Sequence, residues 1–380
     1  MGDSNLILMA GGGTGGHLFP GIAVAEALRT LMPDAQPLFL CTQKEIDRII
    51  LEPTGFEFIP QPIVPLVYSI GGLLRFSKCW RETKDVVRGV LRGRRPVAAL
   101  GLGGYAAGVA IPEAARQKIP CALVNPDVIP GKANQFLLKR VKAVCCQFAS
   151  TANYVAASER SKIKLTGCPI RSDILKLPPR EEAAKRLSLD PRLLTLAVTG
   201  ASLGAKTVNE AVLAMFEGVG LRGWQVLHLS GREHADAVRA GYRELAERGT
   251  PVAARVIDFT PEMADVWAVS DLAVSRAGAS SCAELTACGV PSILLPYPYH
   301  KDMHQRLNAR VLADAGAAVL VDDEKDRRKN AEKLRPVLET LLYDADKRLA
   351  MAQAARNLGQ PRAAENVARV LIEMIEAARA

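Results

Sequence analysis

The chain has 380 residues, of which 49% are hydrophobic and 23% are charged, and its formal net charge is +9. That length is more than one hydrophobic core usually serves, so we expect two domains, and the composition is that of a globular protein. The positive charge predicts an anionic partner, whereas the sparse aromatic residues (5%) argue against stacking on nucleic-acid bases, and no apolar run reaches the ~20 residues that cross a bilayer.

Strand-like and helix-like segments alternate along the first half of the chain. Strands are expected over residues 5–10, 36–41, 97–105, 121–126 and 143–148, and helices over 19–31 and 45–55. This β-α-β alternation is typical of a parallel, doubly wound sheet.

The alternation starts again near residue 193, after a seam within residues 165–187. Strands are then expected over 193–200, 224–231, 254–259, 271–276, 291–297 and 317–323, and an amphipathic helix over 363–380. We predict an α/β architecture with two Rossmann-like, doubly wound parallel-sheet domains facing a cleft. The expected parts are residues 1–168, residues 169–355, and a C-terminal helix within residues 356–380 that packs back towards the first domain.

A glycine-rich loop follows the first predicted strand: residues 11–16 hold five glycines, interrupted only by Thr14. Exposed backbone N–H groups and the start of the next helix both attract anions, so a phosphate or diphosphate is expected here. The glycine spacing also fits a dinucleotide fingerprint, but no acidic residue follows the second strand until Glu45, and the lysine of a P-loop is missing. A plain strand-to-helix turn is the alternative.

His17 stands at the start of the helix after this loop. The helix dipole disfavours a protonated imidazole, so His17 is expected to be neutral and able to act as a general base beside the anion. A packing or capping histidine is the alternative. His228, which lies within an apolar strand, is expected in the core.

A second glycine loop contains Gly200, Ser202 and Gly204 and runs into a helix, which repeats the phosphate-binding pattern. Downstream, Glu284 follows the small polar residues 275–281 near the start of a further helix. One carboxylate beside a phosphate loop suits two ribose hydroxyls. An ordinary glutamate that interacts with the helix dipole is the alternative.

Residues 62–95 mix apolar and basic side chains. The apolar ones are Ile63, Val64, Leu66, Val67, Ile70, Leu73, Leu74, Phe76 and Trp80, and the basic ones are Arg75, Lys78, Arg81, Lys84, Arg88, Arg92, Arg94 and Arg95. An apolar patch rimmed by cations predicts peripheral docking on an anionic bilayer. A core helix with a solvated basic face is the alternative, and nucleic acid is less favoured because no reading helix accompanies the charge.

Eight cysteines are scattered through apolar segments without a C-x-x-C pair, so we expect reduced thiols and no zinc site. The first residues lack the pattern of a signal peptide. Together these features favour a cytosolic location.

Six stretches occur in an order and spacing that resemble the MurG family, within glycosyltransferase family 28: GGTGGHLFPGIAVAEAL, GLGGYAAG, GCPIR, GASLGA, SRAGASSCAE and HKDMHQRLNA. The resemblance covers nearly the whole chain and implies a GT-B fold and an inverting hexosyltransferase. The implied reaction moves GlcNAc from UDP-GlcNAc to the MurNAc 4-hydroxyl of undecaprenyl-pyrophosphoryl-MurNAc-pentapeptide (lipid I), which gives lipid II for peptidoglycan. It also implies a peripheral location on the cytoplasmic face of the inner membrane, with no cofactor and no nucleic-acid partner.

The resemblance assigns roles to individual residues. Thr14, Gly15 and Gly16 would bind substrate, and His17 would be the catalytic base. Further substrate-binding residues would be Asp127, Arg171, Ser202, Thr260, Glu284, His304, Gln305 and Asn308. On the donor side, Ser202 would contact the UDP phosphates, Glu284 the ribose, Thr260 the uracil through its backbone, Gln305 the sugar, and Arg171 would be the donor-site arginine.

The sequence departs from the family pattern near several of these positions. The family's His-Glu-Gln-Asn becomes Val124–Asp127, so Asp127 stands where an asparagine touches the donor sugar. Cys168 and Leu203 replace an asparagine and a glutamine, and His304–Gln305 replaces a glutamine pair. A related transferase that moves another UDP-sugar to a different lipid acceptor is therefore the alternative function. A non-catalytic module that binds anionic lipid or nucleic acid is the alternative from a different class.

Inverting transfer needs a base, an acceptor oxygen behind the anomeric carbon, and stabilisation of the leaving UDP. His17 is assigned to the first task and positioning in the cleft to the second. The Ser202 loop and the helix after it offer preformed N–H donors for the third, so no metal is expected. The first glycine loop would then hold the diphosphate of the acceptor.

Overall fold

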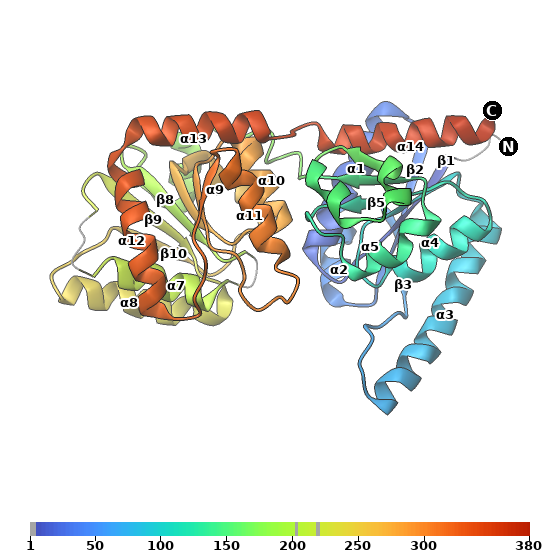
Figure 1. Ribbon diagram of the computed structural model, residues 1–380, viewed down its shortest axis with the longest axis horizontal. Helices are drawn as coiled ribbons and strands as arrows, with labels where there is room; N and C mark the ends of the chain where they lie inside the picture. Colours follow the sequence, from blue (N-terminus) through green and yellow to red (C-terminus); the bar gives the residue numbers. More distant parts are fainter. Residues whose placement is uncertain (1–4, 202–203, 218–220) are drawn as a thin grey trace. The chain divides into compact units, whose positions relative to one another are not determined.

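The computed structural model describes residues 5–201, 204–217 and 221–380, and the chain divides into two compact units (Figure 1). The first unit runs to Arg171 and takes up the chain again at Pro361–Ala380, and the second unit is Ser172–Gln360. The chain thus changes units after Arg171 and after Gln360, close to the boundaries at 168/169 and 355/356 expected from the sequence. Ser202 and Leu203 lie outside the described residues.

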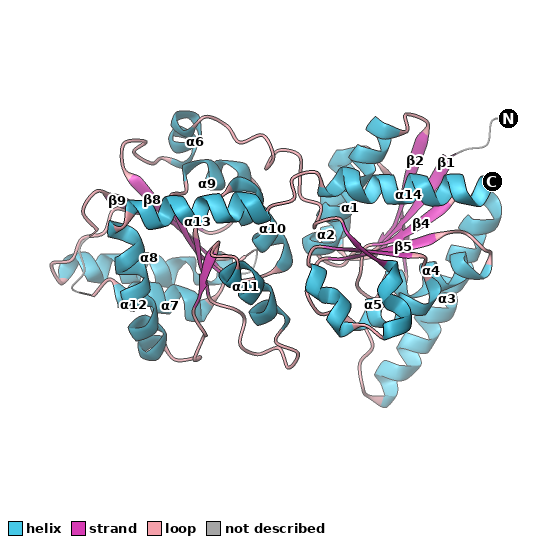
Figure 2. Ribbon diagram, turned by 45° about the horizontal axis from the view of Figure 1, so that its top comes forward, coloured by secondary structure: helices cyan, strands magenta, loops and turns pink. Residues whose placement is uncertain are grey.

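Within the described residues, the first unit has a seven-stranded parallel sheet in the order β3-β2-β1-β4-β5-β6-β7 (Figure 2). The strands are β1 (Asn5–Ala10), β2 (Ala35–Thr42), β3 (Glu57–Gln61), β4 (Ala98–Gly101), β5 (Cys121–Asn125), β6 (Ala143–Cys146) and β7 (Ile163–Leu165). The helices are α1 (Gly15–Leu31), α2 (Glu45–Leu51), α3 (Ile70–Arg94), α4 (Ala107–Arg116), α5 (Lys132–Leu137) and α14 (Ala363–Arg379), with 3₁₀ turns at Glu52–Thr54, Leu138–Arg140, Ala149–Tyr154 and Ala157–Lys162.

The central strand β1 shows why this sheet is covered on both faces. Leu6 and Leu8 pack into one hydrophobic cluster with residues of α3 and α4, whereas Ile7 and Met9 pack into another cluster with residues of α1 and α14. Because successive side chains of a strand point to opposite faces, a strand that is apolar at every position needs helices on both sides. The predicted doubly wound sheet is confirmed.

The second unit repeats this plan, with a six-stranded parallel sheet over its described residues in the order β10-β9-β8-β11-β12-β13. Its strands are β8 (Leu194–Thr199), β9 (Trp224–Leu229), β10 (Ala254–Ile257), β11 (Leu272–Ser275), β12 (Ser292–Leu294) and β13 (Ala318–Leu320). Its helices are α6 (Arg180–Leu187), α7 (Lys206–Met215), α8 (Ala235–Glu247), α9 (Met263–Val269), α10 (Ala279–Cys288), α11 (His304–Asp314), α12 (Arg327–Tyr343) and α13 (Ala345–Leu358), with a 3₁₀ turn at Arg232–His234.

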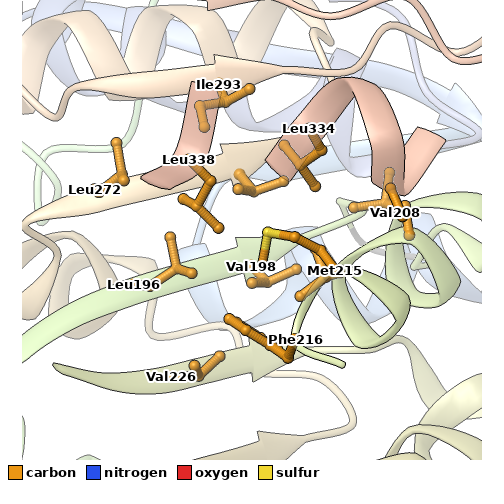
Figure 3. Packing of buried hydrophobic residues seen from close by; sticks show 14 of the residues in the cluster. Leu196, Val198, Val208, Met215, Phe216, Val226, Leu272, Ile293, Leu334 and Leu338 are labelled. Atoms are coloured by element: carbon orange, nitrogen blue, oxygen red, sulfur yellow. The ribbon is translucent and has the colours of Figure 1, made fainter. Parts of the chain in front are cut away.

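Figure 3 shows the packing that fixes one face of this second sheet. Val198 of β8 lies among Met215 and Phe216 at the end of α7 and Leu334 and Leu338 of α12, and all five side chains are buried. Full burial of side chains of this size contributes about 1.5–3 kcal/mol each, so this cluster holds α7 and α12 against the strand. His228 of β9 is buried as expected.

The C-terminal helix α14 belongs to the first unit, where it lies beside α1 (Figure 1). Its buried residues Val367, Ala368, Leu371 and Ile375 recur at helical spacing and join the cluster under α1. The amphipathic pattern predicted for residues 363–380 is therefore matched by one buried face.

Two strands and several element ends differ from the expectations. The strand expected over 97–105 ends at Gly101, and the helix expected from residue 19 begins at Gly15. The edge strands β3 and β7 were not predicted, because their exposed positions break the apolar run that marks a buried strand. The helix expected over residues 45–55 ends at Leu51 and continues as a 3₁₀ turn. Pro53 lies in that turn. Because proline has no N–H to donate, it cannot continue the α-helix, which explains why the helix ends before it.

The cysteines are free, as expected, and most are buried. Burial raises the pKa of the thiols of Cys41, Cys121, Cys145, Cys146 and Cys288 to about 12. These thiols are protonated at neutral pH and are packing groups rather than nucleophiles. None of the described helices is long and apolar enough to cross a membrane.

Candidate active site

The first glycine loop joins the carboxyl end of β1 to the start of α1, and Thr14 is the residue that precedes the helix. Gly13 has a left-handed backbone (φ +84°), and a Cβ atom on Gly12 would collide with the carboxylate of Asp47. Glycine is therefore required at these two positions by backbone conformation and by close approach.

Asp47 of α2 holds this loop from inside the unit, where its side chain is fully buried. Its two oxygens accept hydrogen bonds from the Gly13 N–H at 2.7 and 2.9 Å. Its Oδ2 atom also accepts from the N–H and the hydroxyl of Thr42, each at 2.7 Å. Sequence reasoning missed this residue, since it looked for an acid that would bind a ribose, and this acid binds the loop itself.

Hydrogen bonds within the unit leave fewer backbone amides of the loop able to bind the expected anion. The Gly13 N–H is used by Asp47, and the Gly11 N–H donates to the carbonyl of Leu40 at 3.1 Å. The amides of residues 14–16 lie at the start of α1, where a helix provides no internal acceptors. Lys44 adds a cation beside them, because its ammonium donates to the Gly13 carbonyl at 3.3 Å.

His17 lies in the first turn of α1, half-buried, with its Nδ1 atom 3.2 Å from the Gly12 carbonyl and 3.1 Å from the Thr14 hydroxyl. A carbonyl can only accept, so Nδ1 carries the proton in the neutral ring, and Nε2 carries the lone pair. The ring rests on the turn after β4, where a Cβ on Gly103 or Gly104 would come within 3.1 Å of it.

The charge state of His17 follows from these surroundings. Burial lowers the pKa of His17 below its ordinary value of 6.5. The hydrogen bond to Gly12 and the charges of Asp127 and Asp47 act in the opposite direction, and the charge of Lys44 adds to the lowering. The net effect is a neutral imidazole at neutral pH, which is the form that can accept a proton.

The other predicted residues of the first unit lie at the same carboxyl end of the sheet. Asp127 follows β5, and its carbonyl accepts a hydrogen bond from the Asn125 amide at 2.7 Å. The guanidinium of Arg171 stacks over the ring of Phe19 in α1, 5.3 Å from its centroid. The first unit thus gathers Asp127, Arg171 and the start of α1 around one sheet edge.

In the second unit, the second glycine loop joins β8 to α7. Ser202 falls outside the described residues, but Gly204 beside it has a φ of +74°, and a Cβ there would collide with the carbonyl of Ser230 at the end of β9. The Gly204 N–H donates to Ala201 at 2.9 Å. Gly204 is therefore packed closely against the segment that ends the neighbouring strand, and a glycine is needed at this contact.

Glu284 lies in α10, half-buried, and its Oε2 accepts a hydrogen bond of 2.8 Å from the indole N–H of Trp267 in α9. Trp267 is buried, so it fixes the direction of the carboxylate. Sequence reasoning found the glutamate and missed the tryptophan, because the two residues meet only in the folded unit.

The predicted residues of α11 and β10 lie at this carboxyl edge too. The Gln305 side-chain oxygen accepts from the Tyr297 N–H at 3.0 Å, and the Asn308 amide donates to the Ala277 carbonyl at 3.1 Å. Thr260 follows β10, and its hydroxyl accepts from the Glu262 N–H. His304 is the first residue of α11, and its Nδ1 lies 2.7 Å from Asp302.

A buried polar network ties these loops together. The guanidinium of Arg276 donates to Asp323 at 2.8 Å, to Thr207 in α7 at 2.7 Å and to the Leu295 carbonyl at 2.9 Å. Burial by itself would raise the pKa of Asp323, but the hydrogen bonds from Thr207, Asn330 and Arg276 lower it. Arg276 was read from the sequence only as part of a small polar loop, and it joins the segments after β8, β11 and β12.

Two arrangements in the second unit bear on metal binding. The Asp-x-Asp triplet Asp344–Asp346 could chelate an ion, but the Asp344 carboxylate accepts from the Lys347 N–H and begins α13. His300, Asp302 and His304 place three ligand atoms within 4.8 Å of one another. From the sequence we expected no metal at all: no zinc site, because no C-x-x-C pair occurs, and no ion at the UDP phosphates. Neither argument considered these three residues, which meet on the loop before α11.

The comparisons with known proteins place this geometry in a family. The glycosyltransferase family 28 N-terminal domain matches residues 7–146, and the glycosyltransferase family 28 C-terminal domain matches residues 195–367. A curated relative from Thermodesulfovibrio yellowstonii is 34% identical over 98% of this chain and 100% of its own length. Another from Anaeromyxobacter dehalogenans is 36% identical over 97% of this chain and 93% of its own. Both are named UDP-N-acetylglucosamine–N-acetylmuramyl-(pentapeptide) pyrophosphoryl-undecaprenol N-acetylglucosamine transferase.

Solved structures agree with this match. The crystal structure of Acinetobacter baumannii MurG has a TM-score of 0.75 and 26% identity, and covers 97% of this chain and 99% of its own. A UDP-GlcNAc 2-epimerase from Neisseria meningitidis, with a TM-score of 0.69 and 13% identity over 98% of this chain and 100% of its own, shares the fold. With both domains matched and relatives similar along nearly their whole length, the chain belongs to glycosyltransferase family 28.

Proposed function

We propose that the chain transfers GlcNAc from UDP-GlcNAc to the MurNAc 4-hydroxyl of undecaprenyl-pyrophosphoryl-MurNAc-pentapeptide. The observation that carries this proposal is the 34–36% identity, along nearly the whole chain, to relatives named for that transfer. The two half-sites support it, because one unit offers a neutral histidine beside the amides at the start of α1 and the other offers a carboxylate held by the indole of Trp267.

In the acceptor half, the lipid diphosphate binds the amides of residues 14–16, with the Lys44 ammonium close by. The Nε2 atom of His17 takes the proton of the sugar 4-hydroxyl. The support for this role is the Gly12 carbonyl, which leaves Nε2 as the basic nitrogen.

In the donor half, Glu284 accepts hydrogen bonds from the ribose, and Trp267 holds the carboxylate for this task. The diphosphate binds the loop that carries Ser202 and the start of α7. Thr260 lies beside the uracil, and Gln305 and Asn308 line the part of the donor site that binds the sugar. The network around Arg276 positions the start of α7 through Thr207.

The reaction breaks the bond between the anomeric carbon and the UDP oxygen and forms a bond from the same carbon to the acceptor O4. The hydroxyl proton passes to His17, and UDP leaves with the electron pair of the broken bond. Because the acceptor enters from the face opposite UDP, the anomeric configuration is inverted.

We further propose that the first unit docks on an anionic bilayer at the cytoplasmic face of the inner membrane through the start of α3. Figure 1 shows the loop before α3 and its first turns standing away from the sheet of their unit. Exposed apolar side chains gather there: Leu66, Val67, Tyr68, Ile70, Leu73 and Leu74. Such a patch next to Arg75 and Arg81, both exposed, suits a lipid surface.

The structure corrects part of the expected docking segment. Ile63 is buried, and Phe76 and Trp80 pack against the hydrophobic core under α3 and α4. Arg88 and Arg94 are engaged by Glu113 and Glu57. The proposed docking surface is therefore the first two turns of α3 and the loop before it, whereas the second half of α3 is a core helix.

Incubation of the protein with UDP-GlcNAc and a lipid I analogue tests the proposed reaction. Mass spectrometry is expected to find the acceptor enlarged by one N-acetylhexosamine, with UDP released in equal amount. The proposal fails if UDP is released without a glycosylated acceptor, or if neither product forms while the protein is folded.

A further inference from the structure

The loop before α11 gathers two imidazoles and a carboxylate on one side of a turn. The Met303 N–H donates to the His300 carbonyl at 3.2 Å and closes a four-residue turn, with Met303 in a left-handed conformation (φ +51°). This turn places the side chains of His300, Asp302 and His304 together, two of them exposed and the third half-buried. An ion in solvent can therefore reach all three.

The spacing of the two imidazoles fits a tetrahedral metal. The Nδ1 atom of His300 lies 3.2 Å from the Nε2 atom and 3.3 Å from the Nδ1 atom of His304. Two nitrogens bound tetrahedrally to one ion at 2.0–2.1 Å would be about 3.3 Å apart. The ring planes differ by 36° and the centroids are 4.5 Å apart, so the nitrogens have the right separation, and the rings must turn before both lone pairs face one ion.

Asp302 completes the arrangement. Its Oδ1 atom lies 2.7 Å from the Nδ1 atom of His304, so a neutral His304 carries its proton on Nδ1 and turns the Nε2 lone pair outward. A carboxylate that holds a histidine in this way is the usual support of a metal-bound imidazole, and its second oxygen remains a possible ligand.

The neighbouring residues hold the cluster in place. The ring of Tyr297 meets the His300 ring edge-on, with centroids 4.8 Å apart, and the Tyr297 N–H donates to Gln305. The loop that carries His300 is thereby tied to the first turn of α11 on both sides of the cluster.

We propose that His300, Asp302 and His304 form a binding site for a divalent transition-metal ion. Two imidazoles and one carboxylate are ligands that favour zinc and its neighbours over magnesium or calcium, which prefer oxygen. The ion links the turn to α11 and fixes His304 beside Gln305. The ion takes no part in the proposed glycosyl transfer, although it lies beside Gln305, which is proposed to bind the donor sugar.

The test is calorimetric titration of the full-length protein with zinc chloride in the absence of UDP-GlcNAc. One ion per chain is expected, and cobalt(II) in its place is expected to give the visible absorption of tetrahedral cobalt. His300→Ala and His304→Gln each remove a proposed direct ligand, so each is expected to weaken zinc binding by at least the roughly 10- to 100-fold that loss of an outer-shell partner costs. Circular dichroism checks that each variant is folded.

His234→Ala is the matched control, since it removes a histidine at the start of α8 outside the cluster. It is expected to leave zinc affinity unchanged. Absence of a saturable site in the unaltered protein, or equal affinity in the folded His300→Ala and His304→Gln variants, would overturn the proposal.

Discussion

The proton on Nδ1 of His17 decides which ring nitrogen can act as a base. The Gly12 carbonyl accepts that proton at 3.2 Å, and the turn at Gly103 and Gly104 leaves room for the ring, so Nε2 keeps its lone pair. A substituent as small as a methyl group on either glycine would press on the imidazole. The base therefore depends on backbone groups from two loops.

We predict that His17→Ala lowers kcat by roughly 10²- to 10⁴-fold, the usual share of general base catalysis. Steady-state kinetics with a soluble lipid I analogue measures this. A variant that keeps its kcat and changes only the acceptor KM would show that His17 binds the acceptor without taking its proton.

The pH dependence of kcat/KM in the unaltered enzyme is a second test of His17 as the base. Burial lowers its pKa, so the imidazole stays neutral down to a pH below 6.5 and is protonated only under more acidic conditions. We expect kcat/KM to fall with falling pH, with its midpoint below 6.5, and this acid limb to disappear in His17→Ala. A midpoint above 6.5 would contradict the assignment.

We predict that Glu284→Gln weakens UDP binding, because the loss of a charge-assisted hydrogen bond costs about 1.5–3 kcal/mol. Trp267→Phe keeps the bulk of the buried ring but removes the N–H that holds the carboxylate, and we expect a smaller loss in the same direction. Calorimetric titration with UDP measures both. Unchanged UDP affinity in Glu284→Gln would remove this residue from the donor site.

Sequence patterns could point to His17 and Glu284 because each follows a run of small residues at the start of a helix. They could not point to Asp47 or Arg276. The partners of Asp47 are groups of Thr42 and Gly13, 5 and 34 positions away, and those of Arg276 come from segments up to 69 positions away. Such contacts are set by the pairing of strands and leave no local pattern.

At the scale of the elements, Asp47 of α2 holds the first glycine loop in its conformation. We predict that Asp47→Asn lowers the free energy of unfolding by about 1–3 kcal/mol, because its NH₂ group leaves at least one buried donor without an acceptor. The displaced Gly12–Gly13 peptide would misplace His17, so kcat should fall by roughly 10- to 100-fold. Urea denaturation and steady-state kinetics test the two parts.

Glu45→Gln is the control for this change, since it alters an exposed carboxylate in the same helix. It is expected to keep the unaltered stability and kcat. If Asp47→Asn also keeps the unaltered stability and kcat, the hydrogen bonds of Asp47 do not position His17.

The start of α3 gives a prediction about membrane binding. Ile70, Leu73 and Leu74 are 83%, 49% and 68% exposed, and changing all three to Ser is expected to weaken binding to anionic liposomes at least about tenfold, since burying each such side chain is worth about 1.5–3 kcal/mol. Co-sedimentation measures this, and binding should fall with salt as the basic residues are screened.

Leu349→Ser, which alters an exposed leucine of α13 in the second unit, is the matched control and should bind liposomes normally. The triple variant should still turn over a short-chain soluble acceptor. Unchanged liposome binding by the triple variant would place the docking surface elsewhere. Phe76 is left intact, because its contact with the core makes a change there a test of folding instead.

Element prediction succeeded where burial was complete. The strands at the centre of each sheet are apolar at nearly every position, which gives a clear pattern. The edge strands β3 and β7 carry exposed residues, and the short 3₁₀ turns have no period of their own. The first half of α3 mixes exposed apolar residues with cations, so its sequence fits both docking and packing, and only the folded unit separates the two halves.

At the scale of the whole molecule, two units of similar design divide the work proposed here. The first holds the candidate base and the free amides, and the second holds the candidate ribose ligand and the second glycine loop. The duplicated β-α-β alternation made this division predictable from the sequence. The departures at Asp127 and His304 alter side chains expected near the donor sugar. The choice of donor sugar is therefore the property that they affect most directly.

The most direct measurement compares kcat/KM for UDP-GlcNAc, UDP-GalNAc and UDP-glucose in transfer to a lipid I analogue by the unaltered enzyme. We predict that UDP-GlcNAc is strongly preferred and that its product is lipid II with an inverted anomeric centre. A higher kcat/KM for another UDP-sugar, or no transfer to lipid I from any of the three, would contradict the proposed function.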